Sequence, residues 1–291
     1  MALLRTLGKG AATAASSWKL NLLIWIVTLV MILFVSVPLK SFLVNIFGNS
    51  MAVERFADGF DMGLAGDIGK PFVSLMSAVS LGGLLLLVAG FFLYTFFAGG
   101  LFASYATVWG RLKVNAFIRE SARNFLPFLK IALLMVLIIA LWTFIVVGLP
   151  VIGAMTLLKG STIGTYLIYV FYAVWLLGMP VWLFVGDASR RWVAATGSGQ
   201  ALRALGAGFR ALAEQFWLSY GIVLVIMLLN IVFLFLSLWF TAWSVPSKGW
   251  MIFLFFVATQ ALFITRLFMK AWRYASVCEK AAIPVRDSKT K

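Results

Sequence analysis

The sequence predicts an all-α integral membrane protein with about six transmembrane helices. Hydrophobic residues make up 63% of the 291 residues and charged residues only 11%, whereas soluble domains carry roughly 45–50% apolar and 25% charged residues. The apolar residues form six long runs, and a run of about 20 residues crosses the hydrocarbon core as a helix whose backbone hydrogen bonds close internally. Lys and Arg, in contrast, are concentrated in alternate connections between the runs.

The six runs leave no room for a separate soluble domain, so we expect a single membrane domain over residues 1–291 that ends in a basic cytoplasmic tail over residues 270–291. The predicted spans are residues 20–38, 72–97, 128–149, 166–185, 216–240 and 250–269. The first run is longer than a signal-peptide core, and no small-residue cleavage site follows it, which predicts a retained anchor. Pro150 is expected to end the third span, because proline lacks the backbone N–H of the helical ladder.

The distribution of positive charge predicts the orientation. Of the 24 Lys and Arg residues, nineteen lie at the N-terminus, in the second and fourth connections and at the C-terminal end, and five lie in the other connections. Positive residues are enriched in cytoplasmic loops, so both termini are expected in the cytoplasm. The formal net charge of +15 is explained by this pattern and by contact with anionic lipids, and we expect no nucleic-acid partner.

A basic amphipathic segment precedes the fifth span. Its apolar residues recur at spacings of three and four: Leu202, Leu205, Phe209, Leu212 and Phe216. The N-terminal segment Leu-Arg-Thr-Leu-Gly-Lys-Gly (4–10) matches Leu-Arg-Ala-Leu-Gly-Ala-Gly (202–208) at five of seven positions. Helices of this kind lie in the interface with their basic residues toward anionic headgroups. The candidate lipid contacts are Arg5, Lys9, Arg203 and Arg210.

A third candidate segment precedes the third span, although it lacks the Leu-Arg-x-Leu-Gly-x-Gly pattern. Its apolar residues are Val114, Phe117, Ile118, Phe125 and Leu126. One interpretation is a threefold internal repeat of interfacial helix, outward span and returning span, related by an axis along the membrane normal. The other is that helices entering a membrane from the cytoplasm look alike without common ancestry. The sequence leaves both open.

The residues that carry most enzyme and cofactor chemistry are missing. The chain has no histidine and one cysteine, Cys278, which removes the usual ligands of haem, zinc and copper and the commonest general acid–base group. We therefore expect no enzymatic activity, no cofactor and no metal. The external connection over residues 40–70 holds four carboxylates, a composition compatible with a hard cation, but their spacing is not that of a calcium loop. A solvated surface loop is the favoured interpretation.

Few polar residues fall inside the predicted spans, and none of them is Asp or Glu, the residues that usually mark ion or proton pathways. Asn230 and Gln260 lie near the middle of the fifth and sixth spans, where they form either an interhelical contact or part of a substrate site. At the end of the fourth span, Asp187 and Arg190 are expected to form an interfacial ion pair.

Two segments resemble a known group of proteins. Phe97-Ala98-Gly99-Gly100 closes the second run, and the sequence Ala-Arg-Asn-Phe-Leu-Pro-Phe over 122–128 leads into the third. In this plan the chain resembles a loose group of bacterial six-helix membrane proteins, mostly uncharacterised, which includes the membrane region of some glycerophosphoryl diester phosphodiesterases. The likeness spans most of the chain without a diagnostic motif. It implies a multi-pass protein of the bacterial inner membrane, and the absence of a phosphodiesterase catalytic segment means that no catalytic residue is carried over.

These features together predict a non-enzymatic inner-membrane protein that is a lipid-contacting scaffold or a subunit of an envelope complex, with membrane lipids and other membrane proteins as partners. The alternative is a passive transporter or flippase for an amphipathic or lipid-like molecule, which requires a polar cavity around Asn230 and Gln260. A third hypothesis, an interfacial lipid enzyme, requires carboxylates and arginines to converge, and Asp187 with Arg190 is the nearest candidate.

Overall fold

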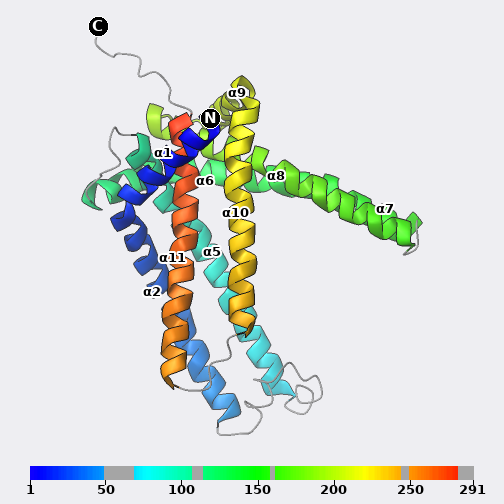
Figure 1. Cartoon of the computed structure of the whole chain (residues 1–291). Coiled ribbons are helices and arrows are strands. Elements are labelled where there is room, and N and C mark those ends of the chain that lie inside the picture. Colours follow the sequence, from blue (N-terminus) through cyan, green and yellow to red (C-terminus); the bar gives the residue numbers. More distant parts are fainter. Residues whose placement is uncertain (49–68, 107–113, 158–160, 244–248, 281–291) are drawn as a thin grey trace. The chain divides into compact units, whose positions relative to one another are not determined.

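The computed structural model describes residues 1–48, 69–106, 114–157, 161–243 and 249–280 (Figure 1). Nearly all of these residues are helical and none of them lies in a strand. Six stretches are long and apolar enough to cross a membrane: Trp18–Ser41, Phe72–Tyr105, Val114–Thr156, Thr162–Thr196, Phe216–Trp243 and Gly249–Lys280. Each predicted span falls within one of them, so the prediction of an all-α protein with six membrane-spanning helices is confirmed.

The described residues form two compact units. Unit 2, Leu23–Tyr94, consists of most of α2 (Trp18–Phe47) and most of α5 (Lys70–Ala106). The two helices meet at glycine: a Cβ built on Gly82 would lie 3.2 Å from Cγ1 of Val35. Small residues permit this close approach in membrane helices. The single membrane domain over 1–291 stays a prediction, and the external acidic residues of the first connection lie outside the described residues.

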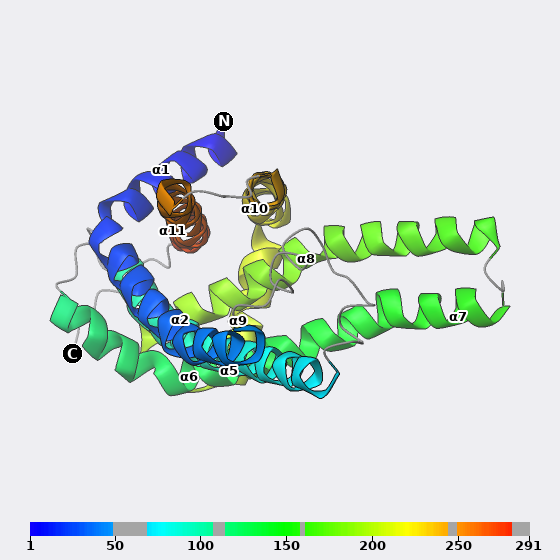
Figure 2. The same cartoon turned by 90° about the horizontal axis from the view of Figure 1, so that it is seen from below.

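Unit 1 comprises Met1–Leu22 and Thr95–Lys291. Its elements, besides the adjoining ends of α2 and α5, are α1 (Ala2–Ser16), α6 (Val114–Thr143), the π-helix η1 (Phe144–Gly148), α7 (Leu149–Leu157), α8 (Thr162–Thr196), α9 (Ala201–Glu214), α10 (Phe216–Trp243) and α11 (Gly249–Lys280). In Figure 2, α7 and α8 run side by side and α1 lies beside α11. Gly197 has a φ of +67° and ends α8 in the left-handed conformation that glycine adopts freely.

The prediction that Pro150 ends the third span is wrong, since helix α7 begins at Leu149 and continues to Leu157. The five-residue π-helix Phe144–Gly148 lies directly before it. A π-turn shifts the hydrogen-bond register of the helix, and Pro150 then occupies the first turn of α7, where a missing N–H is tolerated. The helix therefore passes the proline without ending.

Burial is concentrated at one end of the spans of unit 1. The buried residues of α11 all lie between Leu267 and Cys278, and most of those of α8 lie between Pro180 and Val193. Elsewhere large apolar side chains are exposed, as at Phe235 and Leu137, which suits contact with lipid. The tightly packed part of unit 1 is thus the end that also carries α1 and α9 (Figure 1).

Candidate functional site: a helical collar at the span ends

Three amphipathic segments pack against the ends of three spans. Helix α1 packs on α11, α9 packs on α8, and residues 114–127 of α6 pack on the last residues of α5. We call these three segments, together with span ends 97–106, 184–193 and 271–280, the collar. All of it belongs to unit 1. The third segment is not a separate helix, because α6 runs unbroken through Pro127 into the span.

Two of the collar contacts are made by equivalent glycines. A Cβ built on Gly10 of α1 would overlap Oγ of Ser276 on α11, and one built on Gly208 of α9 would lie 2.6 Å from the carbonyl oxygen of Val185 on α8. Gly10 and Gly208 hold the same position in the two Leu-Arg-x-Leu-Gly-x-Gly segments. Each helix therefore approaches its span at a distance that only glycine permits.

In the third contact the glycines lie on the span and the larger residues on the amphipathic segment, the reverse of the first two contacts. A Cβ built on Gly100 of α5 would overlap Ser121 and Phe117 of α6. Asn124 of α6 also donates a hydrogen bond of 3.5 Å to the carbonyl oxygen of Gly99. The segment before the third span thus makes the same kind of close contact without carrying the glycine motif.

An Ala-Ser pair near the end of each returning span lies within the collar. The pairs are Ala103-Ser104 on α5, Ala188-Ser189 on α8 and Ala275-Ser276 on α11. All three serines are fully buried, and the residues that precede the pairs, Phe102, Asp187 and Tyr274, are buried as well. Sequence reasoning missed these pairs, although three copies of one dipeptide near the ends of alternate runs were visible.

A buried ion cluster links α8 to α11. Asp187 places Oδ1 3.3 Å from Nη1 of Arg190 and Oδ2 2.8 Å from Nε of Arg273. The guanidinium of Arg273 lies over the Tyr274 ring, and the Tyr274 ring contacts that of Phe102 at a centroid distance of 4.7 Å. The expected pair of Asp187 with Arg190 forms, but as part of a buried cluster. Both carboxylate oxygens of Asp187 lie within ion-pair distance of a guanidinium.

The polar residues predicted deep in the spans are engaged locally where the structure describes their contacts. Asn230 donates a hydrogen bond of 2.9 Å to the carbonyl oxygen of Ile226 in its own helix, α10. Gln260 is half-buried on α11. A substrate site between the two amides stays a prediction.

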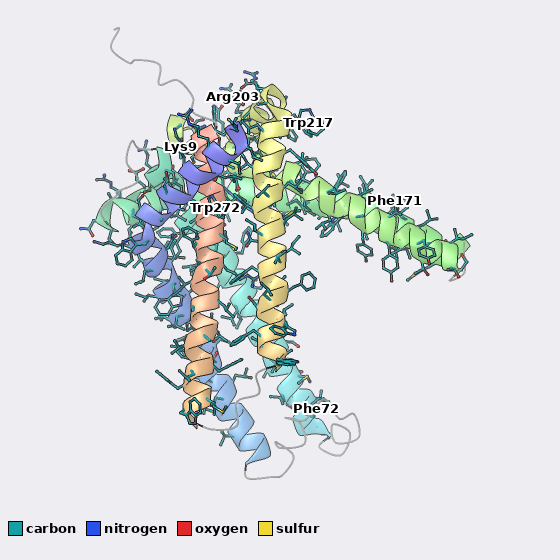
Figure 3. The ribbon with its side chains drawn as sticks, viewed as in Figure 1. Lys9, Phe72, Phe171, Arg203, Trp217 and Trp272 are labelled. Carbon is teal, nitrogen blue, oxygen red and sulfur yellow. The ribbon has the colours of Figure 1, made fainter. Side chains whose placement is uncertain are left out.

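The four candidate lipid contacts, Arg5, Lys9, Arg203 and Arg210, are all exposed on the collar helices α1 and α9. Figure 3 shows Lys9 and Arg203 at the same end of unit 1. Residues 281–291 of the basic tail lie outside the described residues. In the described ranges, no group of three or more His, Cys, Asp or Glu gathers as metal ligands would.

No protein-family model, no curated protein and no solved structure matches the chain.

Proposed function

We propose that the chain is a non-enzymatic scaffold of the bacterial inner membrane whose collar lies in the cytoplasmic headgroup layer and contacts anionic lipids. The observation that carries this proposal is that α1 and α9 each bury one face in the protein and expose basic residues on the other. On α1, Leu7, Gly10 and Ala14 are buried, while Arg5 and Lys9 are exposed. The packed face fixes the helix, and the exposed cations are presented to the surroundings.

Helix α9 has the same arrangement. Ala204, Leu205, Gly208 and Leu212 are buried, whereas Arg203 and Arg210 are exposed. Basic residues on interfacial helices attract anionic headgroups by about 1 kcal/mol each at the membrane surface. Two rigidly held helices with exposed cations at one end of the spans therefore favour a membrane surface of negative charge.

The charge distribution supports the orientation in this proposal. The basic connections that sequence counting assigns to the cytoplasm include both collar helices and the ends of α8 and α11, and the structure gathers these elements at one end of unit 1 (Figure 3). Trp18 and Trp217 are exposed at the starts of α2 and α10, where an indole suits the headgroup level. Both termini then lie in the cytoplasm.

A scaffold of this kind also serves as a subunit of an envelope complex. Mild extraction of a tagged chain from its host should recover a stoichiometric protein partner in that case, and repeated isolation as a lone monomer counts against it. The passive transporter or flippase needs a polar cavity around Asn230 and Gln260, and the local hydrogen bond of Asn230 gives it no support.

Lipid enrichment tests the proposed function. Extraction with a styrene–maleic acid copolymer keeps the surrounding lipid, and we expect the wild-type particle to contain more phosphatidylglycerol and cardiolipin than the bulk membrane. The variant Arg5→Gln/Lys9→Gln/Arg203→Gln/Arg210→Gln should lose most of this enrichment, because four surface cations are removed.

The matched control is Lys40→Gln/Lys70→Gln, which removes two cations from the predicted external side. It should leave the enrichment unchanged. Equal lipid composition in the particle and the bulk membrane, or full enrichment in the fourfold variant, would contradict the proposal.

A further inference from the structure

The buried ion cluster of the collar carries an excess of positive charge. Asp187 is in contact with Arg190 and Arg273, and its side chain is only 2% exposed. Arg191 follows directly on α8 and is also buried, with 8% of its surface exposed. Asp187 is thus shared by two guanidinium groups, and Arg191, four positions after Asp187 on α8, brings a third guanidinium to this end of the helix. In the described part of the chain no other carboxylate lies within ion-pair distance of these arginines.

Several guanidinium nitrogens in the cluster lack an acceptor. Nε and Nη1 of Arg191 and Nε of Arg190 are buried without a hydrogen-bond partner among the described residues. Glu279 is nearby on α11, but it is exposed, and solvent weakens its attraction for Arg191. A buried charge without a partner is strongly destabilising. The cluster is therefore incomplete as a purely internal ion network.

A phosphate group has the chemistry that the cluster lacks. Guanidinium groups bind phosphate oxygens through paired, charge-assisted hydrogen bonds, and several arginines can share one phosphate. The side chains of Arg190 and Arg273 keep 17% and 18% of their surface exposed, so the cluster is reachable from outside the protein. Arg191 lies five residues before the end of α8 at Thr196, at the depth where phospholipid phosphates lie under the proposed function.

We propose that Arg190, Arg191 and Arg273 bind the phosphate group of one anionic phospholipid, with Asp187 holding the first and last of them in place. This inference rests on the proposed membrane orientation, and it deepens the proposed function by adding one specific lipid site to the general attraction of the exposed cations. Two guanidinium nitrogens of Arg191 are buried without a hydrogen-bond partner, so binding depends most strongly on this residue.

The test measures lipid retention on the full-length protein. Purified wild type is delipidated in detergent, titrated with phosphatidylglycerol or phosphatidylcholine, and examined by native mass spectrometry. We expect one tightly retained phosphatidylglycerol and no equivalent phosphatidylcholine. Arg191→Gln should weaken this binding by about tenfold or more, the effect of losing a hydrogen bond to a charged group.

Two further variants separate the role of Arg191 from general effects of charge. Lys40→Gln removes an exposed cation of α2, outside the collar, and should leave the tight site intact. Arg191→Lys keeps the charge but loses the planar fork, so it should bind more tightly than Arg191→Gln and less tightly than wild type. Circular dichroism and gel filtration of each variant show that it is folded. Wild-type retention of phosphatidylglycerol by folded Arg191→Gln would overturn the inference.

A parallel titration with inorganic phosphate in phosphatidylcholine nanodiscs separates the two sources of phosphate. Arg191-dependent thermal stabilisation by inorganic phosphate, which phosphatidylglycerol does not displace, would overturn the lipid assignment in favour of a soluble ligand. Loss of bulk enrichment in the fourfold surface variant with an Arg191-independent tight lipid would overturn this site alone and leave the proposed function standing.

Discussion

Two glycines of the same short motif have different surroundings in each collar helix. A Cβ on Gly10 would overlap Ser276, whereas a Cβ on Gly8 would have nothing within 4 Å. The same difference separates Gly208 from Gly206 on α9. The second glycine of each motif is required for close packing, and the first is not. This arrangement provides an internal control for the packing.

We predict that Gly10→Ala and Gly208→Ala each destabilise the protein by about 1–3 kcal/mol, the usual cost of inserting a methyl group into a packed contact. Gly8→Ala and Gly206→Ala should instead be neutral or stabilising by up to about 1 kcal/mol, because alanine favours a helix over glycine. Thermal unfolding in detergent, followed by circular dichroism, measures the difference. Equal effects at both glycines of a motif would show that the close contacts do not contribute to stability.

Sequence periodicity predicted helix α9 but only part of its packed face. Leu202 and Phe209 belong to the predicted apolar stripe of α9, yet both are exposed, and the packed face includes Ala204 and Gly208. In water a large apolar side chain indicates the buried face, but beside a membrane it is equally suited to lipid. Small residues mark helix contacts there. The predicted stripe was therefore correct for the helix and incomplete for its contacts.

At the scale of the element, α1 depends on its contact with α11. It has 15 residues, a length at which an isolated helix is only marginally stable in water. Nε1 of Trp272 on α11 donates a hydrogen bond of 2.8 Å to the carbonyl oxygen of Leu7. Leu7 in turn packs in a cluster with Ile222 and Ile226 of α10. This set of contacts fixes the middle of α1 to two spans.

We predict that Trp272→Phe loosens α1 while leaving the spans intact. The substitution removes one hydrogen bond worth about 1 kcal/mol, which corresponds to about fivefold faster amide exchange in the helix. Hydrogen–deuterium exchange of residues 2–16 measures this effect. Trp217→Phe is the matched control, because Trp217 is 83% exposed. Unchanged exchange in Trp272→Phe would mean that α1 is held by its other contacts.

At the scale of the whole chain, the collar contacts follow a cyclic order. The segment of α6 packs on α5, the end of the first pair of spans, and α9 packs on α8, the end of the second pair. Helix α1 packs on α11, the second helix of the third pair, so the first helix of the chain contacts the last one. Entry into a membrane requires an amphipathic helix but not a buried Ala-Ser pair in each returning span. This order of contacts is the one that a threefold internal repeat predicts.

Hydropathy predicted the six spans because each is a local property of the sequence. It could not predict the cyclic order of the collar contacts, because these contacts join residues far apart in the sequence. The hydrogen bond from Trp272 to Leu7, for example, joins residues 265 positions apart. Packing between membrane helices depends on small residues and single polar contacts that leave little periodic signal. For the same reason only part of the ion cluster could be predicted from the sequence. Arg190 is three positions from Asp187 on the same helix, whereas Arg273 belongs to another helix.

A cyclic repeat predicts that the chain tolerates new ends between its units. Leu3 packs near Gly221 at the start of α10, and Lys280 donates hydrogen bonds to Gln215 and Ser219, so the described ends of α1 and α11 approach the same part of α10. A circular permutant that joins residue 291 to Met1 and opens at Gly199 would leave α9 as its first helix, packed on α8 as its last. We expect it to be inserted and monodisperse, with a melting temperature within a few degrees of wild type.

The control joins the same ends and opens at residue 159, between α7 and α8, which places the new ends on the opposite side of the membrane against the charge bias. Equal failure of both permutants in membrane insertion would contradict the cyclic repeat, since the first keeps the native orientation and the control does not.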